Sequence, residues 1–171
     1  GTEYDYYWLL STSLSFQDIP GDPDPLQQML AIFQADPACV GVGPAFSGRV
    51  TAWPHRYNSV LASQPQPMIN TVGLWDRRWF ERVGGFDRRL KSGWGSDFEL
   101  AAKAKWGKKR LWVCKPAEML LSEGATYASG QNGSQAEYHA QARIEMINVF
   151  ERKYGPEWED LLIGWFTHER P

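Results

Sequence analysis

The sequence predicts a single α/β domain over residues 1–171, in which a layered sheet is flanked by helices. Three observations favour this fold class. Short apolar runs typical of strands alternate with segments of helical periodicity, and no hairpin turn signals join the strands. The length of 171 residues also suits one domain with a sizeable core.

Four segments have the apolar composition of buried strands: 4–10, 39–46, 68–74 and 110–114. The second of these is rich in glycine, which indicates a close approach of its backbone to other groups. Helices are expected from Pro25 to about Asp36, from Arg77 to Val83, and over 97–106, 134–154 and 156–166. Asp24 and Asp76 are the expected caps of the first two. Residues 47–67 show no convincing periodicity.

Net charge, cysteine spacing and apolar run length indicate which classes of protein the chain can belong to. The net charge of −2 argues against a nucleic-acid-binding protein, which usually has a basic face. Cys39 and Cys114 follow no metal or redox spacing, so we expect two buried, reduced thiols and a cytoplasmic protein. No apolar run is long enough for a transmembrane segment.

Asp97 is the strongest candidate for a catalytic group. It follows the loop Gly93-Trp94-Gly95-Ser96 and lies in the first turn of a predicted helix. The helix dipole favours an ionised carboxylate there, and such a group can accept a proton from a sugar hydroxyl. From position alone a second interpretation stays open, in which Asp97 only caps the helix.

The motifs around Asp97 extend the interpretation. The chain reads VGGFD over 83–87, GWGSDFEL over 93–100 and NVFERKYG over 148–155. This pattern resembles the inverting family 2 glycosyltransferases of the GT-A fold, and it matches mainly their C-terminal, acceptor-binding half. The resemblance implies a partial GT-A fold and transfer of a sugar from a nucleotide-activated donor to a glycan acceptor.

The resemblance also assigns roles to residues. Asp97 falls on the general base of the family, and Trp94, Gly95 and Trp75 fall in the acceptor pocket. Ser96 departs from the acidic residue that usually precedes the base.

The metal-binding positions of the family are degenerate in this chain. Family members carry a D-x-D motif after the strand that corresponds to residues 4–10, and its carboxylates hold Mg²⁺ or Mn²⁺. Here those positions are Ser11, Thr12 and Ser13, whose uncharged hydroxyls are weak ligands. A metal-binding histidine of many relatives is also missing from residues 116–123. His55 remains a weak candidate for the site, whereas His139 is expected on a helix surface.

The nucleotide-binding half of the family has no counterpart in this sequence, so we expect either a fragment of a longer enzyme or a reduced protein. Without those strands, residues 4–10 would leave a sheet edge exposed, which favours a homodimer through that edge. The alternative function is a catalytically incompetent module that binds a glycan or a partner protein.

Overall fold

The computed structural model describes residues 4–10, 14–16, 24–47, 55–58, 60–121 and 134–165. Within these ranges six strands form one mixed sheet: β1 (Tyr6–Leu9), β2 (Leu14–Phe16), β3 (Cys39–Ser47), β4 (Gln64–Gln66), β5 (Gly73–Asp76) and β6 (Arg110–Leu121). The described helices are α1 (Pro25–Ala35), α2 (Arg77–Arg82), α3 (Ser96–Trp106) and α5 (Gln135–Tyr154), with a 3₁₀ turn η1 (His55–Asn58) and a π-helical turn η2 (Asp160–Gly164).

The sheet has the strand order β1-β5-β3-β6-β2, and β4 pairs with β6 outside this path. The central strands β3 and β6 are parallel, whereas the other pairs are antiparallel. The predicted α/β class, with a sheet flanked by helices, is therefore confirmed.

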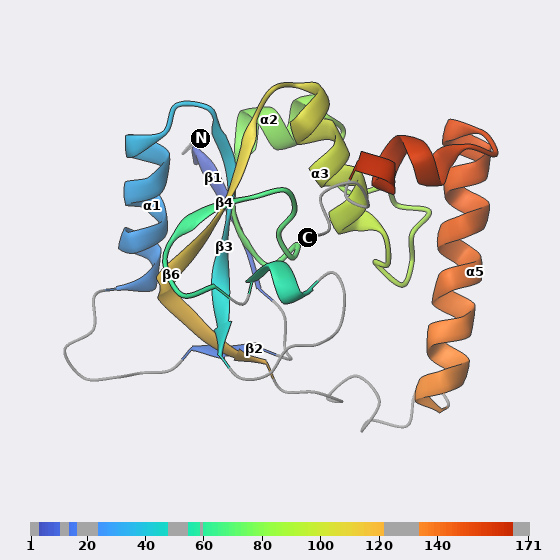
Figure 1. The fold of residues 1–171 in the computed structure, drawn as a ribbon, viewed down its shortest axis with the longest axis horizontal. Helices are drawn as coiled ribbons and strands as arrows, with labels where there is room; N and C mark the ends of the chain where they lie inside the picture. Colours follow the sequence, from blue (N-terminus) through green and yellow to red (C-terminus); the bar gives the residue numbers. More distant parts are fainter. Residues whose placement is uncertain are drawn as a thin grey trace.

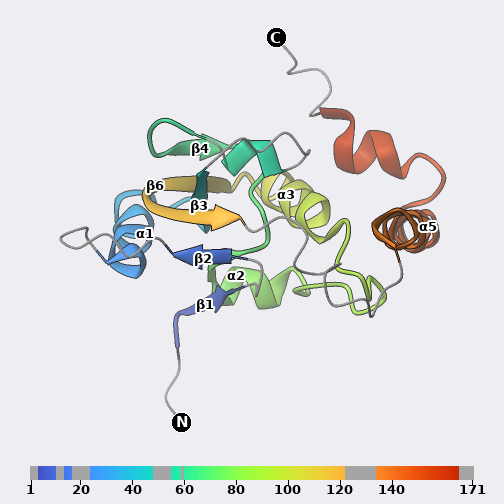
Figure 2. The same ribbon diagram turned by 90° about the horizontal axis from the view of Figure 1, so that it is seen from below.

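Helices cover the sheet unequally (Figures 1 and 2). Helix α1 lies on one side, α2 and α3 lie on the other, and α5 stands beyond α3, farthest from the strands. Val42 of β3 packs on the α1 side, whereas Val40 joins the core beneath α3 and α5, because the register of β3 shifts between Cys39 and Gly41. Trp112 and Val113 are neighbours on β6 and enter the two cores by ordinary strand alternation.

The predicted helix starts are confirmed by their caps. Asp24, Asp76 and Ser134 each accept a hydrogen bond from a backbone N–H in the first turn of α1, α2 and α5. At the other end, Gly107 and Gly155 follow α3 and α5 directly. The last predicted helix, 156–166, is present in its described part as the turn η2 and a few flanking residues.

The glycines of β3 confirm the predicted close approach. A Cβ added to Gly41 would lie 2.7 Å from the Trp75 ring, and one added to Gly43 would lie 2.9 Å from the Asn58 side chain. Both Cys39 and Cys114 are buried free thiols, as expected.

The strand prediction for 68–74 was wrong in its boundaries, because β5 begins only at Gly73. Side chains replace the strand pairing before that point. The Asn58 carboxamide accepts a hydrogen bond from Asn70 N, and the Asn70 carboxamide accepts one from Val72 N. These two side-chain bonds, one from a distant residue and one local, satisfy backbone N–H groups that lie outside the sheet.

Strands β2 and β4 were not predicted, and the strand predicted over 110–114 extends to Leu121 as β6. Strand β4 has the sequence QPQ, so no apolar alternation marks it. Strand β6 contains Pro116, and its register against β3 shifts between Pro44 and Phe46.

Strand β1 lies at one end of the described sheet and pairs there with β5. Around it Tyr4, Trp8 and Leu10 are exposed by 70%, 37% and 60%. No helix in the described part of the chain has both the length and the apolar composition to cross a bilayer.

Candidate functional site

The N-terminal end of α3 carries Asp97 in its first turn, as predicted. One carboxylate oxygen, Oδ1, accepts a hydrogen bond from Phe98 N at 3.0 Å. Removal from water raises the pKa of Asp97 to about 6, while this bond and the backbone N–H of Asp97 itself lower it. Asp97 as a whole residue is half-buried.

Two faces of α3 carry two different carboxylates. Asp97 shares a face with Leu100, Ala101 and Ala104 by helical spacing, and each of these three is 1% exposed in the core beneath the helix. Glu99 shares the other face with Lys103 and is itself 1% exposed. Asp97 therefore lies at the end of the sheet-facing side, whereas Glu99 faces α5.

The loop before Asp97 requires glycine at position 95. Gly95 caps α3 with a φ of +87°, a conformation that L side chains rarely adopt. A Cβ there would also lie 2.8 Å from both Met146 and Phe150 of α5. Gly93 has a φ of +77° but open space around it.

Helix α5 holds the same loop by hydrogen bonds. The Ser92 amide and hydroxyl each donate to Glu145 Oε1 at 2.8 Å, and the Tyr138 hydroxyl donates to Ser92 O at 3.3 Å. A single carboxylate thus fixes both the backbone and the side chain of Ser92, at the start of the turn that leads to Asp97.

Trp94 forms an aromatic contact with α5. Its ring centroid lies 5.0 Å from that of His139 at an interplanar angle of 50°. The ring centroid of Tyr138 lies 6.2 Å from that of His139. Both Trp94 and His139 are half-buried. His139 was expected on a helix surface; it is half-buried there, because the neighbouring loop places Trp94 against it.

Lys153 joins the three sequence motifs. Its ammonium donates to Asp87 of the 83–87 motif at 2.8 Å and to Glu99 of the 93–100 motif at 2.5 Å. Tyr154, the next residue of α5, also donates to Glu99 at 2.5 Å. The three sequence motifs are thus in mutual contact through one partly buried ion-pair network.

The network shifts the pKa values of Asp87, Lys153 and Tyr154. Hydrogen bonds from Arg89, and then from Lys153, hold the pKa of Asp87 well below its usual range. Burial raises the pKa of Tyr154, and the hydrogen bond to Glu99 raises it further. Burial disfavours the charge of Lys153, but the bonds to Asp87 and Glu99 outweigh it and raise its pKa. These groups keep fixed protonation states near neutral pH.

The remaining predicted site residues are dispersed. Trp75 has no exposed surface; its ring stacks on Trp79 at 6.0 Å, and its indole N–H donates to Thr71 O. Contact with a sugar there would require the core to open. Ser11, Thr12 and Ser13 lie outside the described residues. Their assignments stay predictions.

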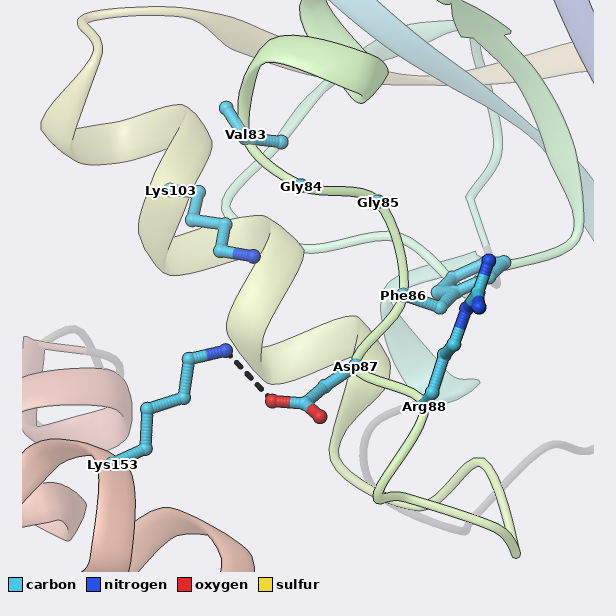
Figure 3. A pocket seen from close by; sticks show the side chains of 8 residues that line it. All are labelled: Val83, Gly84, Gly85, Phe86, Asp87, Arg88, Lys103 and Lys153. Atoms are coloured by element: carbon cyan, nitrogen blue, oxygen red, sulfur yellow. Dashed lines mark hydrogen bonds and ion pairs between the residues drawn. The ribbon is translucent and has the colours of Figure 1, made fainter.

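A pocket of about 310 Å³ lies on the α5 side of α3 (Figure 3). It is lined by Val83, Gly84, Gly85, Phe86, Asp87, Arg88, Lys103 and Lys153. Asp97 is not among these residues, so the pocket and the candidate base are separate features.

Among the described residues, no three His, Cys, Asp or Glu side chains gather into a metal-binding group. Comparison of the chain with protein-family models and with curated proteins finds no match.

Proposed function

We propose that this chain is the acceptor side of an inverting glycosyltransferase-like domain with a partial GT-A fold, and that Asp97 is its general base. The observation that carries the proposal is the position of Asp97 in the first turn of α3, where burial raises the pKa of its carboxyl group to about 6. A base with this pKa is largely ionised at neutral pH and still accepts a proton. The motif resemblance supplies the reaction class.

The proposed step is a single displacement. The acceptor hydroxyl gives its proton to the Asp97 carboxylate while its oxygen bonds to the anomeric carbon of the donor sugar. The bond from that carbon to the diphosphate oxygen breaks, and the nucleoside diphosphate leaves with the electron pair. Attack opposite to the leaving group inverts the anomeric configuration. Trp94 would stack on the C–H face of the acceptor sugar, with Gly95 beside it.

A divalent cation has no strong ligands at the positions expected for it. Ser11, Thr12 and Ser13 offer uncharged hydroxyls, which hold Mg²⁺ or Mn²⁺ poorly. The donor set does not fit the metal, so the step above assigns it no role.

A second function draws on that same substitution. A catalytically incompetent module would keep the aromatic contact of Trp94 with His139 for binding a glycan or partner and would not turn over a nucleotide sugar. Trp fluorescence separates the two functions. A response to a nucleotide diphosphate sugar, with or without Mn²⁺, supports the enzyme, whereas a response to oligosaccharide alone supports the module.

The decisive test measures nucleoside diphosphate release and glycan product with a panel of nucleotide sugars and oligosaccharides. Asp97→Asn should abolish transfer while its circular dichroism and oligosaccharide binding stay unchanged. Glu151→Gln, an exposed change on α5, is the matched control and should retain transfer. Turnover by the Asp97 variant at the wild-type rate would disprove the assignment of the base.

The proposal extends to self-association and location. The exposed Tyr4, Trp8 and Leu10 suit pairing of β1 with the β1 strand of a second copy. Light scattering that gives a monomer mass at every protein concentration would exclude such a dimer. The buried free thiols of Cys39 and Cys114 suit the reducing cytoplasm.

A further inference from the structure

The pocket beside Gly84 and Gly85 has two ammonium groups at its wall. Lys103 projects from α3 and Lys153 from α5, and both side chains extend toward the backbone of 84–87 (Figure 3). The volume of about 310 Å³ is about ten times that of a water molecule, about 30 Å³ in the liquid, so a phosphate or a similar group fits inside.

The Lys103 ammonium is poorly compensated. Its side chain is 14% exposed. In the described part of the chain its ammonium forms an ion pair with Glu99, at a distance of 3.4 Å from Oε1. A charge-assisted hydrogen bond is usually about 2.7–2.9 Å long. Burial lowers the pKa of Lys103, because a buried ammonium loses its hydration. An ammonium has three donors, so Lys103 has donor capacity left for a ligand.

The carboxylates near the pocket are already engaged. Asp87 accepts hydrogen bonds from the Arg89 guanidinium at 2.9 and 2.7 Å and from Lys153 at 2.8 Å. Glu99 is 1% exposed and is held by Lys153 and Tyr154. An anion that enters the pocket can therefore bind the ammonium of Lys103 while Asp87 and Glu99 keep their hydrogen bonds to Arg89, Lys153 and Tyr154.

We propose that this pocket binds a small oxyanion, a phosphate or carboxylate group, between Lys103 and Lys153. Lys103 supplies the main charge-assisted hydrogen bonds, and the remaining donor of Lys153 completes the site. The ligand links the 84–87 turn and α3 to α5, so its binding stabilises the docking of α5. This site is distinct from Asp97 and does not depend on glycosyl transfer.

The test is an NMR titration of the ¹⁵N-labelled chain at constant ionic strength. Inorganic phosphate, glucose 6-phosphate and glucuronate form three arms, which distinguish free phosphate from a phosphate or carboxylate carried on a sugar. We expect saturable shifts of the Gly84, Gly85 and Lys103 amides with at least one of them, and a rise in the melting temperature with the same compound.

Two lysine variants complete the experiment. Lys103→Met keeps the aliphatic stem and should weaken binding about tenfold or more, because it removes charge-assisted hydrogen bonds. Lys91→Met removes an exposed charge and should bind like the wild type. Shifts that do not saturate in any arm, or equal affinity of the wild type and Lys103→Met, would overturn the proposal. Should Lys103→Met fail to fold, the position of the shifts in the wild type decides.

Discussion

Lys153 of α5 donates a hydrogen bond to Glu99 of α3 at 2.5 Å, and Glu99 is only 1% exposed. The same ammonium reaches Asp87 at 2.8 Å. A lysine near the end of the last long helix thus neutralises a carboxylate buried two residues after the candidate base. The part of the sequence that resembles a catalytic motif is therefore also the part to which α5 docks.

Removing Lys153 should destabilise the fold. Lys153→Met leaves Glu99 buried with weaker compensation, and we expect the free energy of unfolding to fall by about 2–4 kcal/mol in urea titrations. Combining it with Glu99→Gln should recover part of that loss, because no uncompensated charge then remains. Arg152→Met, on the exposed side of α5, is the control and should change stability by less than about 0.5 kcal/mol. Additive effects of the two network substitutions would contradict the coupling.

Gly93 and Gly95, in the loop before Asp97, both have a positive φ and allow a matched pair of substitutions. Gly93→Ala introduces only a left-handed backbone strain of about 1–2 kcal/mol, since nothing lies within 4 Å of its added Cβ. Gly95→Ala adds contacts of 2.8 Å with Met146 and with the fully buried Phe150 ring, so we expect about 1–3 kcal/mol more. Chemical denaturation of both variants measures the difference. Equal destabilisation would show that α5 does not press on the loop.

The anchoring of Ser92 by Glu145 can be tested by hydrogen exchange. Glu145→Ala removes the acceptor of both the Ser92 amide and hydroxyl, so exchange of the Ser92 amide should accelerate by roughly tenfold or more. Glu145→Gln keeps an oxygen acceptor and should restore most of the protection. Glu151→Ala, an exposed change on the same helix, should leave Ser92 unaffected. Unchanged exchange in Glu145→Ala would remove the basis for the anchor.

The raised pKa of Asp97 makes stability depend on pH in a defined direction. Below about pH 4 Asp97 is protonated in both the folded and the unfolded chain, so the wild type and Asp97→Asn should be similarly stable. Between about pH 4 and pH 6 the folded wild type keeps the Asp97 proton, whereas the unfolded chain releases it. The stability of the wild type should then fall below that of Asp97→Asn by about 1–2 kcal/mol.

Urea unfolding of both chains at pH 4 and pH 8 measures this gap. A gap that stays constant with pH would place Asp97 in an ordinary aqueous environment and would weaken its assignment as a tuned base. The measurement needs no substrate, so it remains informative whether or not the chain transfers sugars.

Local signals in the sequence predicted much of the fold. Asp24, Asp76 and Ser134 mark helix starts because a side chain two or three residues away from a free N–H can bond it. The strand boundary at Gly73 was not predictable in this way, because it depends on Asn58 reaching Asn70 across the fold. Strand β4 was missed for a similar reason, since β6 determines its pairing and its own composition gives no signal.

In the candidate site too, local signals were predictable from the sequence, whereas contacts between distant residues were not. The position of Asp97 in the first turn of α3 follows from the glycines that precede it, and the sequence predicted it correctly. The contacts of Glu145 with Ser92 and of His139 with Trp94 join residues more than forty positions apart. The only available signal was the helical spacing of α5, which predicts a buried stripe but not the partner it covers.

The contacts of α5 with the loop over 92–95 restrict the length of the helix. Tyr138, Glu145, Phe150 and Lys153 all reach segments between Asp87 and Glu99, and by helical spacing they lie on one side of α5, within an arc of about 140°. One inserted residue between Tyr138 and Glu145 would turn the rest of the helix by about 100° and point the later three away together. Ile144, 61% exposed, can change freely by comparison. The number of residues in α5 is thus more tightly restricted than the identity of most of them.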